Sequence, residues 1–188
     1  MTVILASQSP RRRELMALLR IPFSVRVADI DETMNPTASP YDEVARLSKE
    51  KALAVPRQAD DIVIAADTIV VCDNRVLGKP HTRDEAISML QQLSGNCHQV
   101  MTGLTVLHGQ QQKTVTEVTQ VTFRPLTEEE ITAYVRTGEP MDKAGAYGIQ
   151  GGGAVFVEKL VGDYYNVVGL PVCKLWQLLQ EIAPQLRN

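Results

Sequence analysis

The amino-acid sequence predicts an α/β or α+β fold built around a mixed β-sheet. Segments that favour strands and segments that favour helices mix along the chain without strict alternation, which is typical of such sheets. Two β-rich segments, 99–107 and 114–123, form a predicted antiparallel pair joined by a polar turn. The 188 residues, 44% of them hydrophobic and 22% charged, suit one domain or one bilobed unit with a sizeable core.

The first third of the chain predicts two strands, each followed by a helix. The strands are expected over 3–6 and 23–27, and the helices begin at the pairs Ser9-Pro10 and Ser39-Pro40. Serine caps a helix N-terminus and proline favours the first helical position. The second helix is expected to run to about Val55. The predicted apolar faces are Leu15, Met16, Leu18 and Leu19 in the first helix, and Val44, Leu47 and Ala54 in the second.

The remainder of the chain predicts a hairpin, three helices and a glycine-rich stretch. A long β-rich segment, 62–72, turns at Asp73-Asn74 into a second strand. Thr82 and Thr127 are each followed three residues later by Glu, a capping box that begins a helix. The other expected features are helix ends at Leu93 (before Gly95) and Val135, glycine-rich residues 145–153, a strand over 154–159 and a helix over about 170–183.

The composition argues against nucleic-acid and membrane partners. Nineteen Lys and Arg against 22 Asp and Glu give a formal net charge of −3, which disfavours general capture of a nucleic-acid backbone. The longest apolar run is interrupted by Asp67 and is too short to span a bilayer. The three cysteines have no metal-ligand spacing and are expected to be reduced thiols. No export signal is read in the first 13 residues, so a cytoplasmic location is expected.

Residues 7–13, Ser-Gln-Ser-Pro-Arg-Arg-Arg, put three arginines at a predicted helix start. A helix N-terminus carries unpaired N–H groups and a partial positive charge, so the arginines are unfavourable there unless an anion binds. Ser7, Ser9, backbone N–H groups and guanidinium groups together suit a phosphate. Successive helical residues point in different directions, so Arg11, Arg12 and Arg13 cannot all face one ligand. A solvated basic turn is the alternative.

Asp67 lies inside an apolar strand, where a carboxylate is costly unless it is paired or binds a cation. A metal ligand or general base is favoured, and a buried salt bridge or strand end is the alternative. With Asp67, the acidic residues Asp29, Asp31 and Glu32 can supply oxygen ligands to a divalent cation. A solvated side chain is the default for the remaining candidates Lys51 and Lys79, and residues 148–153 do not match a dinucleotide fingerprint. Taken together, these residues suit a metal-bridged polyphosphate.

Motifs spread in order along nearly the whole chain resemble those of the Maf family of nucleoside triphosphate pyrophosphatases. The matching segments are Leu5 to Arg13, Asp31-Glu32, Arg46-Leu47 with Lys51-Ala52, Ala66-Asp67-Thr68, Gly78-Lys79-Pro80, Leu93-Ser94-Gly95, Met141 to Gly151, and Val168 to Pro171. The resemblance implies the fold of inosine triphosphatases, a long mixed sheet flanked by helices, with two lobes and a central cleft. It further implies one bilobed domain over residues 1–188 and a cytoplasmic homodimer.

The same resemblance implies hydrolysis of a nucleoside triphosphate between its α and β phosphates. Asp67 is the implied proton acceptor, and Arg11, Thr68 and Gln150 fall on the substrate-specificity positions. Arg, Thr and Gln at those positions are typical of the branch that acts on dTTP and UTP. That activity implies removal of unwanted nucleotides, including modified pyrimidine triphosphates, and a link to arrest of cell division.

A mechanism follows from these assignments. Glu32 and Asp67 are expected to hold a divalent cation, Mg²⁺ or Mn²⁺, while Arg12, Lys51 and Lys79 neutralise the triphosphate. Asp67 deprotonates the attacking water, although tight metal binding and proton abstraction compete for the same carboxylate. The alternatives are a nucleotide-binding regulator without turnover, a protein that binds nucleic acid, and a pyrophosphatase for non-standard purine triphosphates.

Overall fold

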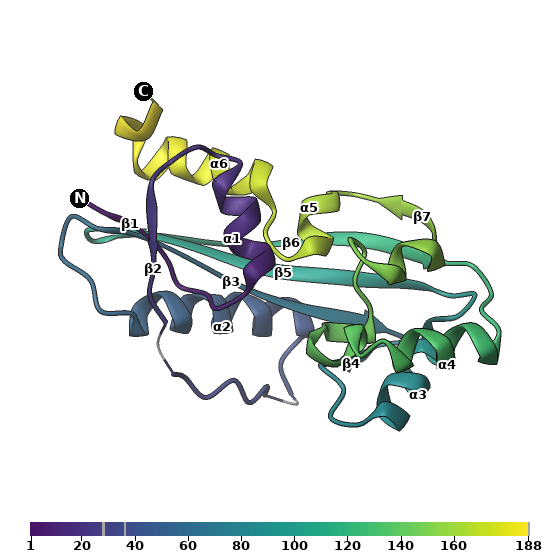
Figure 1. Ribbon diagram of the computed structural model, residues 1–188. Coiled ribbons are helices and arrows are strands. Elements are labelled where there is room, and N and C mark those ends of the chain that lie inside the picture. Colours follow the sequence, from purple (N-terminus) through teal and green to yellow (C-terminus); the bar gives the residue numbers. More distant parts are fainter. Residues whose placement is uncertain (28, 36, 188) are drawn as a thin grey trace. The chain divides into compact units, whose positions relative to one another are not determined.

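A computed structural model describes residues 1–27, 29–35 and 37–187 of the chain (Figure 1). The strands are β1 (Val3–Leu5), β2 (Phe23–Val25), β3 (Ile62–Cys72), β4 (Arg75–Leu77), β5 (Cys97–His108), β6 (Gln111–Phe123) and β7 (Val157–Val161). The helices are α1 (Pro10–Ala17), α2 (Pro40–Ala54), α3 (Arg83–Leu93), α4 (Glu128–Arg136), α5 (Tyr164–Val168) and α6 (Val172–Ile182), with short 3₁₀ helices such as Gly152–Phe156. No helix among the described residues is long and apolar enough to cross a membrane.

The described strands form a mixed seven-stranded sheet, as predicted. Its order is β2-β1-β3-β5-β6-β7, and β4 pairs with the end of β3. Strand β1 runs parallel to β2 and β3, whereas the pairs β3–β4 and β6–β7 are antiparallel. The chain divides into two compact units, residues 1–67, 102–117 and 169–188 in the first, and residues 68–101 and 118–168 in the second. The expected single bilobed domain with a central cleft stays a prediction.

In the first unit, α2 lies on one face of the strands and α1 and α6 lie on the other (Figure 1). Apolar side chains of β1, α2, β3 and β5 form a buried cluster that comprises Ile4, Ala6, Ala52, Val55, Val63, Ala65 and Leu107. Gly103 on β5 brings the backbone of α2 very close, because a Cβ there would lie 2.0 Å from the carbonyl oxygen of Val44. This close packing fixes α2, and therefore the side chains that it carries, against the sheet.

The caps of α1 and α2 are confirmed, but their buried faces differ in part from the prediction. Ser9 and Ser39 accept hydrogen bonds from backbone N–H groups three residues on, and Pro occupies the first helical position of each helix. Leu15 and Met16 are the buried residues of α1, whereas Leu18 at its C-cap is 56% exposed. Ala54 is exposed and Ala52 is buried instead. The reason is that the side chains of α2 that pack against the sheet recur every four residues along the helix.

In the second unit, α3 and α4 cover a core rich in aromatic side chains. The predicted capping box at Thr127 is complete, whereas the Glu85 carboxylate accepts from the N–H of His81 instead of closing back on Thr82. The predicted strand over 154–159 begins later, at Val157, because the preceding turn directs the Phe156 ring edge-on against Tyr134 at a centroid distance of 5.0 Å.

The last predicted helix, over about 170–183, is present as α6, and a short helix that was not predicted precedes it. Helix α5 ends at Val168 and α6 begins at Val172. Gly169 between them has a φ of +122°, a conformation that favours glycine, and Pro171 occupies the N-cap of α6. The predicted helix is thus confirmed, with its start two residues later than about residue 170, and α5 was not predicted.

Burial of His98 in the second unit generates a pH prediction. Its Nε2 lies 2.9 Å from the Tyr147 hydroxyl, and burial lowers the pKa of His98 to about 4. The pKa of this histidine is about 6.5 in the unfolded chain and about 4 in the folded chain, so between these pH values the unfolded chain binds more protons. The free energy of unfolding therefore falls as the pH is lowered through this range. Between pH 7 and pH 5 we expect a loss of about 2 kcal/mol from this group.

Urea unfolding of the wild type and of His98→Gln at pH 7 and pH 5 measures this contribution. The variant is expected to be less stable at pH 7 but to lose about 2 kcal/mol less than the wild type on acidification. Equal pH dependence in the two proteins would contradict the account of His98.

Candidate functional site

The turn between β1 and α1 is held by a cluster of side-chain hydrogen bonds in the first unit. The Oγ of the buried Ser7 accepts from the backbone N–H of Ser9 at 3.2 Å and from Arg12 Nη1 at 3.3 Å. A serine hydroxyl has two acceptor lone pairs and one O–H donor. With both acceptor positions of Ser7 used, the chemistry of its O–H suits donation to a ligand oxygen. The N-terminus of α1 adds its partial positive charge at the same place.

Arg12 is the arginine that turns inward from this helix start. Its Nε donates to the carbonyl oxygen of Gly169 at 2.7 Å, whereas Arg13 is exposed. Burial lowers the pKa of Arg12, and the charges of Asp67 and Glu32 oppose that shift. Arg12 therefore lies in the electrostatic field of both predicted catalytic carboxylates. Arg11 is near enough to Arg12 to lower its pKa further, by like-charge repulsion.

Lys51 joins the two carboxylates predicted to act in catalysis. Its Nζ lies 2.6 Å from Asp67 Oδ1 and 3.0 Å from Glu32 Oε1. The side chains of Lys51 and Asp67 are only 14% and 12% exposed, whereas that of Glu32 is 59% exposed. The buried salt bridge considered as an alternative for Asp67 is thus present. It is compatible with a functional role, because a buried carboxylate needs such a partner to stay charged.

Glu32 lies on a loop that is tied to α2 by residues that the sequence did not single out for this role. The buried Glu43 accepts from the backbone N–H of Asn35 at 2.8 Å, and Arg46 Nη2 donates to the carbonyl oxygen of Thr33 at 2.9 Å. Hydrogen bonding with Arg46 lowers the pKa of Glu43. Helix α2 therefore presents Lys51 directly and holds the loop that carries Glu32.

The donor set suits a divalent cation only together with a ligand. Among the described residues no three His, Cys, Asp or Glu side chains gather into a metal-binding group. Asp31 accepts from the backbone N–H of Thr33 at 2.9 Å, and both Asp29 and Asp31 are exposed. The Lys51 ammonium contacts oxygens of both Glu32 and Asp67, so the two carboxylates together form a negatively charged site that binds a cation. One or two carboxylates completed by substrate phosphates are the usual protein setting of Mg²⁺.

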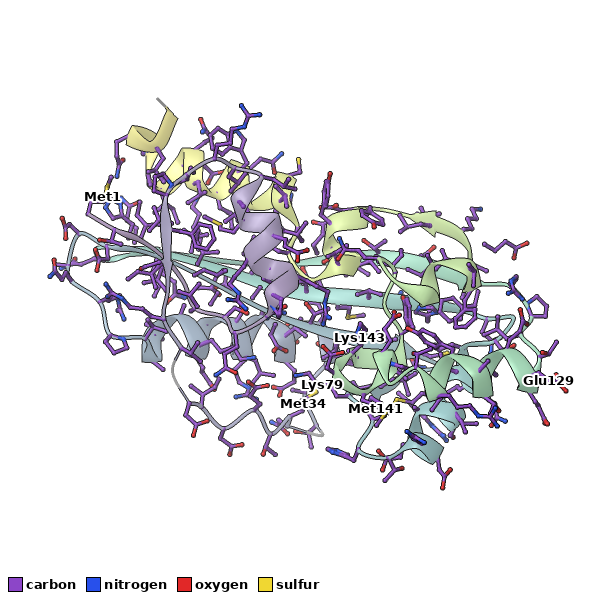
Figure 2. The ribbon with its side chains drawn as sticks, in the orientation of Figure 1. Met1, Met34, Lys79, Glu129, Met141 and Lys143 are labelled. Atoms are coloured by element: carbon purple, nitrogen blue, oxygen red, sulfur yellow. The ribbon has the colours of Figure 1, made fainter. Side chains whose placement is uncertain are left out.

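The second unit carries the other three predicted site residues. Thr68 is partly buried on β3, and Lys79 is exposed on the loop after β4, as Figure 2 shows. Gln150 is exposed in the turn that begins the glycine-rich segment. Because these side chains are partly or fully exposed, each can contact a ligand. That they act together with the residues of the first unit stays a prediction.

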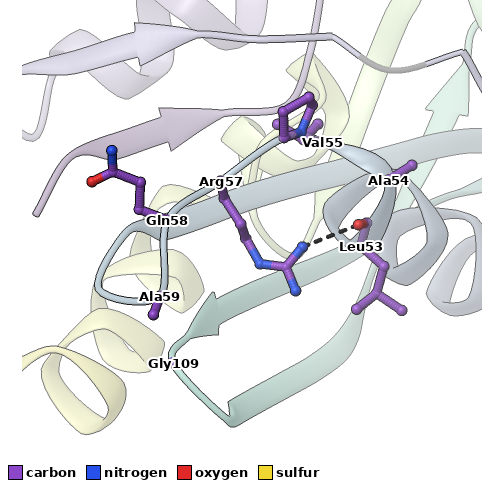
Figure 3. A pocket seen from close by; sticks show the side chains of 8 residues that line it. Leu53, Ala54, Val55, Arg57, Gln58, Ala59 and Gly109 are labelled. Atoms are coloured by element: carbon purple, nitrogen blue, oxygen red, sulfur yellow. Dashed lines mark hydrogen bonds between the residues drawn. The ribbon is translucent and has the colours of Figure 1, made fainter.

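A surface pocket of about 460 Å³ lies elsewhere in the first unit (Figure 3). Residues 53–59 and Gly109 line it, and none of them is a predicted site residue. Its charged side chain, Arg57, donates to the carbonyl oxygen of Leu53 at 3.0 Å near the C-terminus of α2. Arg57 thereby stabilises the helix end, so we assign the pocket no role in the site.

Comparison with known proteins agrees with the resemblance seen in the sequence. A family model described as Maf-like protein matches residues 2–182. The chain is 51% identical over 180 residues to proteins named dTTP/UTP pyrophosphatase from Bacillus velezensis (95% of each chain) and Bacillus cereus strain G9842 (95% and 94%). A HAM1 protein from Coxiella burnetii has the same fold, with a TM-score of 0.52 and 17% identity over 96% of this chain and 100% of its own.

The likeness to the HAM1 protein confirms the expected fold, and the family match covers nearly the whole chain rather than one motif. Half of the aligned positions are identical in relatives of nearly the same length. On these grounds the chain belongs to the family of Maf-like proteins.

Proposed function

We propose that this chain is a nucleoside triphosphate pyrophosphatase that hydrolyses dTTP and UTP to the monophosphate and pyrophosphate. The observation that carries the proposal is the Lys51–Asp67 ion pair, whose carboxylate also acts on Arg12. Arg12 belongs to residues 7–12 at the start of α1, which we call the serine–arginine turn. A proton acceptor is thereby combined with an anion-binding turn. Relatives that are 51% identical to this chain are named dTTP/UTP pyrophosphatase, and these names support the proposed reaction and its two substrates.

The serine–arginine turn is proposed to bind the triphosphate. The Ser7 hydroxyl and the N–H groups at the start of α1 donate hydrogen bonds to phosphate oxygens. Arg12 is held by Gly169, so its guanidinium is already ordered before the substrate arrives. An ordered cation stabilises charge on the phosphates without a further loss of side-chain entropy.

Asp67 is proposed to remove a proton from the attacking water. The water oxygen forms a bond to the α-phosphorus, the bond from that phosphorus to the bridging oxygen breaks, and pyrophosphate leaves. The water proton passes to the Asp67 carboxylate. Lys51 fixes the orientation of that carboxylate through the 2.6 Å contact and adds positive charge near the phosphates. Lys79 is assigned the same neutralising role.

Glu32 and Asp67 are proposed to hold the divalent cation, Mg²⁺ or Mn²⁺, together with phosphate oxygens. The bound ion supplies Lewis acidity, which withdraws negative charge from the triphosphate. Glu32 is the more exposed of the two carboxylates, so it can bind an arriving ion while Asp67 keeps its contact with Lys51.

The base is proposed to be read by Arg11, Thr68 and Gln150. The Gln150 side chain has both a donor and an acceptor, which complement O4 and N3 of a pyrimidine. The branch of the family that acts on dTTP and UTP has the same three residue types at these positions, and this is why the resemblance indicates those substrates. A homodimer and a cytoplasmic location are also proposed, on the resemblance to the family.

A panel of triphosphates tests the reaction and the substrate together. With Mg²⁺ present, we expect pyrophosphate as the first product and higher kcat/KM for dTTP and UTP than for ATP, GTP or ITP. Orthophosphate as the first product would contradict cleavage between the α and β phosphates. Preference for ITP would favour the purine alternative, and tight binding without turnover would favour a regulator.

Replacing Asp67 tests the proton acceptor. Asp67→Asn keeps the shape of the side chain but removes its basicity, so turnover is expected to fall about 10²- to 10⁴-fold. Binding of dTTP, measured by calorimetry, is expected to persist because the serine–arginine turn is unchanged. Asp60→Asn is the matched control, since Asp60 is 62% exposed and pairs with the amino terminus. Unchanged turnover in folded Asp67→Asn would refute the assignment.

A further inference from the structure

The segment that presents Gln150 is built largely of glycine, so its shape has to be imposed by contacts with neighbouring residues. Within it, Gly151 N–H donates to the carbonyl oxygen of Gly148 at 3.2 Å, and Ala154 N–H donates to that of Gly151 at 3.0 Å. Glycine has more conformational freedom than any other residue. Contacts with side chains outside the segment therefore contribute to fixing its conformation.

Tyr134 of α4 holds one end of this glycine-rich loop, which we define as Gly148–Gly153. The Tyr134 hydroxyl accepts from the Gly148 N–H at 3.0 Å and donates to Glu139 Oε1 at 2.9 Å. Tyr134 is only 6% exposed, and burial raises the pKa of its hydroxyl. The hydroxyl therefore stays protonated and keeps both hydrogen bonds in one direction.

Glu139 holds the other end of the loop. Its Oε2 accepts from the Gly152 N–H at 2.9 Å, while Oε1 binds Tyr134. A Cβ on Gly151 would lie 2.2 Å from Glu139 Oε1, so glycine at that position makes room for the carboxylate. Lys143, labelled in Figure 2, in turn donates to the Glu139 carbonyl oxygen at 2.6 Å. The residues on both sides of Gln150 are thus fixed by one phenol–carboxylate pair.

We propose that Tyr134 and Glu139 are positioning residues that hold the glycine-rich loop in the shape that presents Gln150, and so set the preference for pyrimidine bases. The selectivity part rests on the proposed function, because it takes Gln150 as the residue that reads the base. The positioning part rests on the hydrogen bonds to Gly148 and Gly152 alone. Neither Tyr134 nor Glu139 is assigned contact with the substrate.

Tyr134→Phe is the sharpest test because it removes only the hydroxyl and keeps the ring that packs on Phe156. Amide hydrogen exchange at Gly148 and Gly152 is expected to become at least about fivefold faster, as loss of a hydrogen bond of about 1 kcal/mol implies. The ratio of kcat/KM for UTP to that for ATP is expected to fall by a similar factor, mainly through a higher KM for UTP. Glu139→Gln, which keeps one acceptor oxygen, is expected to give a smaller change in both measurements.

Tyr164→Phe is the matched control, since it removes a tyrosine hydroxyl from a 41% exposed position of the same unit. It is expected to change neither measurement. Unchanged exchange at both glycines in Tyr134→Phe would overturn the proposal. Faster exchange with unchanged selectivity would also overturn it, provided that Gln150→Ala does lower the selectivity.

Gln150→Ala separates this inference from the proposed function. If it leaves the selectivity unchanged while Tyr134→Phe still accelerates exchange, the role of Gln150 in the proposed function is refuted and the positioning of the loop is supported. If the wild type hydrolyses no triphosphate, the proposed function fails, and exchange at Gly148 and Gly152 still decides whether Tyr134 and Glu139 hold the loop.

Discussion

The 2.6 Å ion pair between Lys51 and Asp67 places two charges where both side chains are less than 15% exposed. Removing one partner of such a buried pair typically costs about 3–5 kcal/mol, because the other charge is left without compensation. The pair therefore requires that α2, which carries Lys51, keep its position against β3, which carries Asp67. Gly103 meets this requirement by letting the α2 backbone approach β5. The same salt bridge holds the carboxylate that we propose as the proton acceptor.

A second constraint of the same kind acts on the glycine-rich loop of the other unit. There a buried phenol and a carboxylate, Tyr134 and Glu139, supply the order that glycine cannot supply itself. In both places a polar group that is costly to bury is satisfied by a specific partner. Asp67, the proposed proton acceptor, is paired with Lys51, and the loop that carries Gln150, the proposed base-reading residue, is bonded to Tyr134 and Glu139.

Features encoded by neighbouring residues were predictable from the sequence. The caps at Ser9, Ser39 and Thr127 depend on side chains within three residues, and the structure confirms them. The burial of Asp67 followed from the apolar strand around it, but its partner did not, because a lysine on a helix is by default solvated. The contact of Arg12 with Gly169 joins residues 157 positions apart, and no local pattern encodes it. Gly103 carried a usable signal, since glycine inside a strand often marks a close backbone approach.

In the proposed reaction, water activated at Asp67 attacks the α-phosphorus. Hydrolysis of dTTP in water enriched in ¹⁸O, followed by mass spectrometry of both products, distinguishes this attack from attack on the β-phosphorus. We expect the label to enter the phosphate of the thymidine monophosphate and the pyrophosphate to stay unlabelled. Label in the pyrophosphate would place the attack on the β-phosphorus and would contradict the assignment of the site.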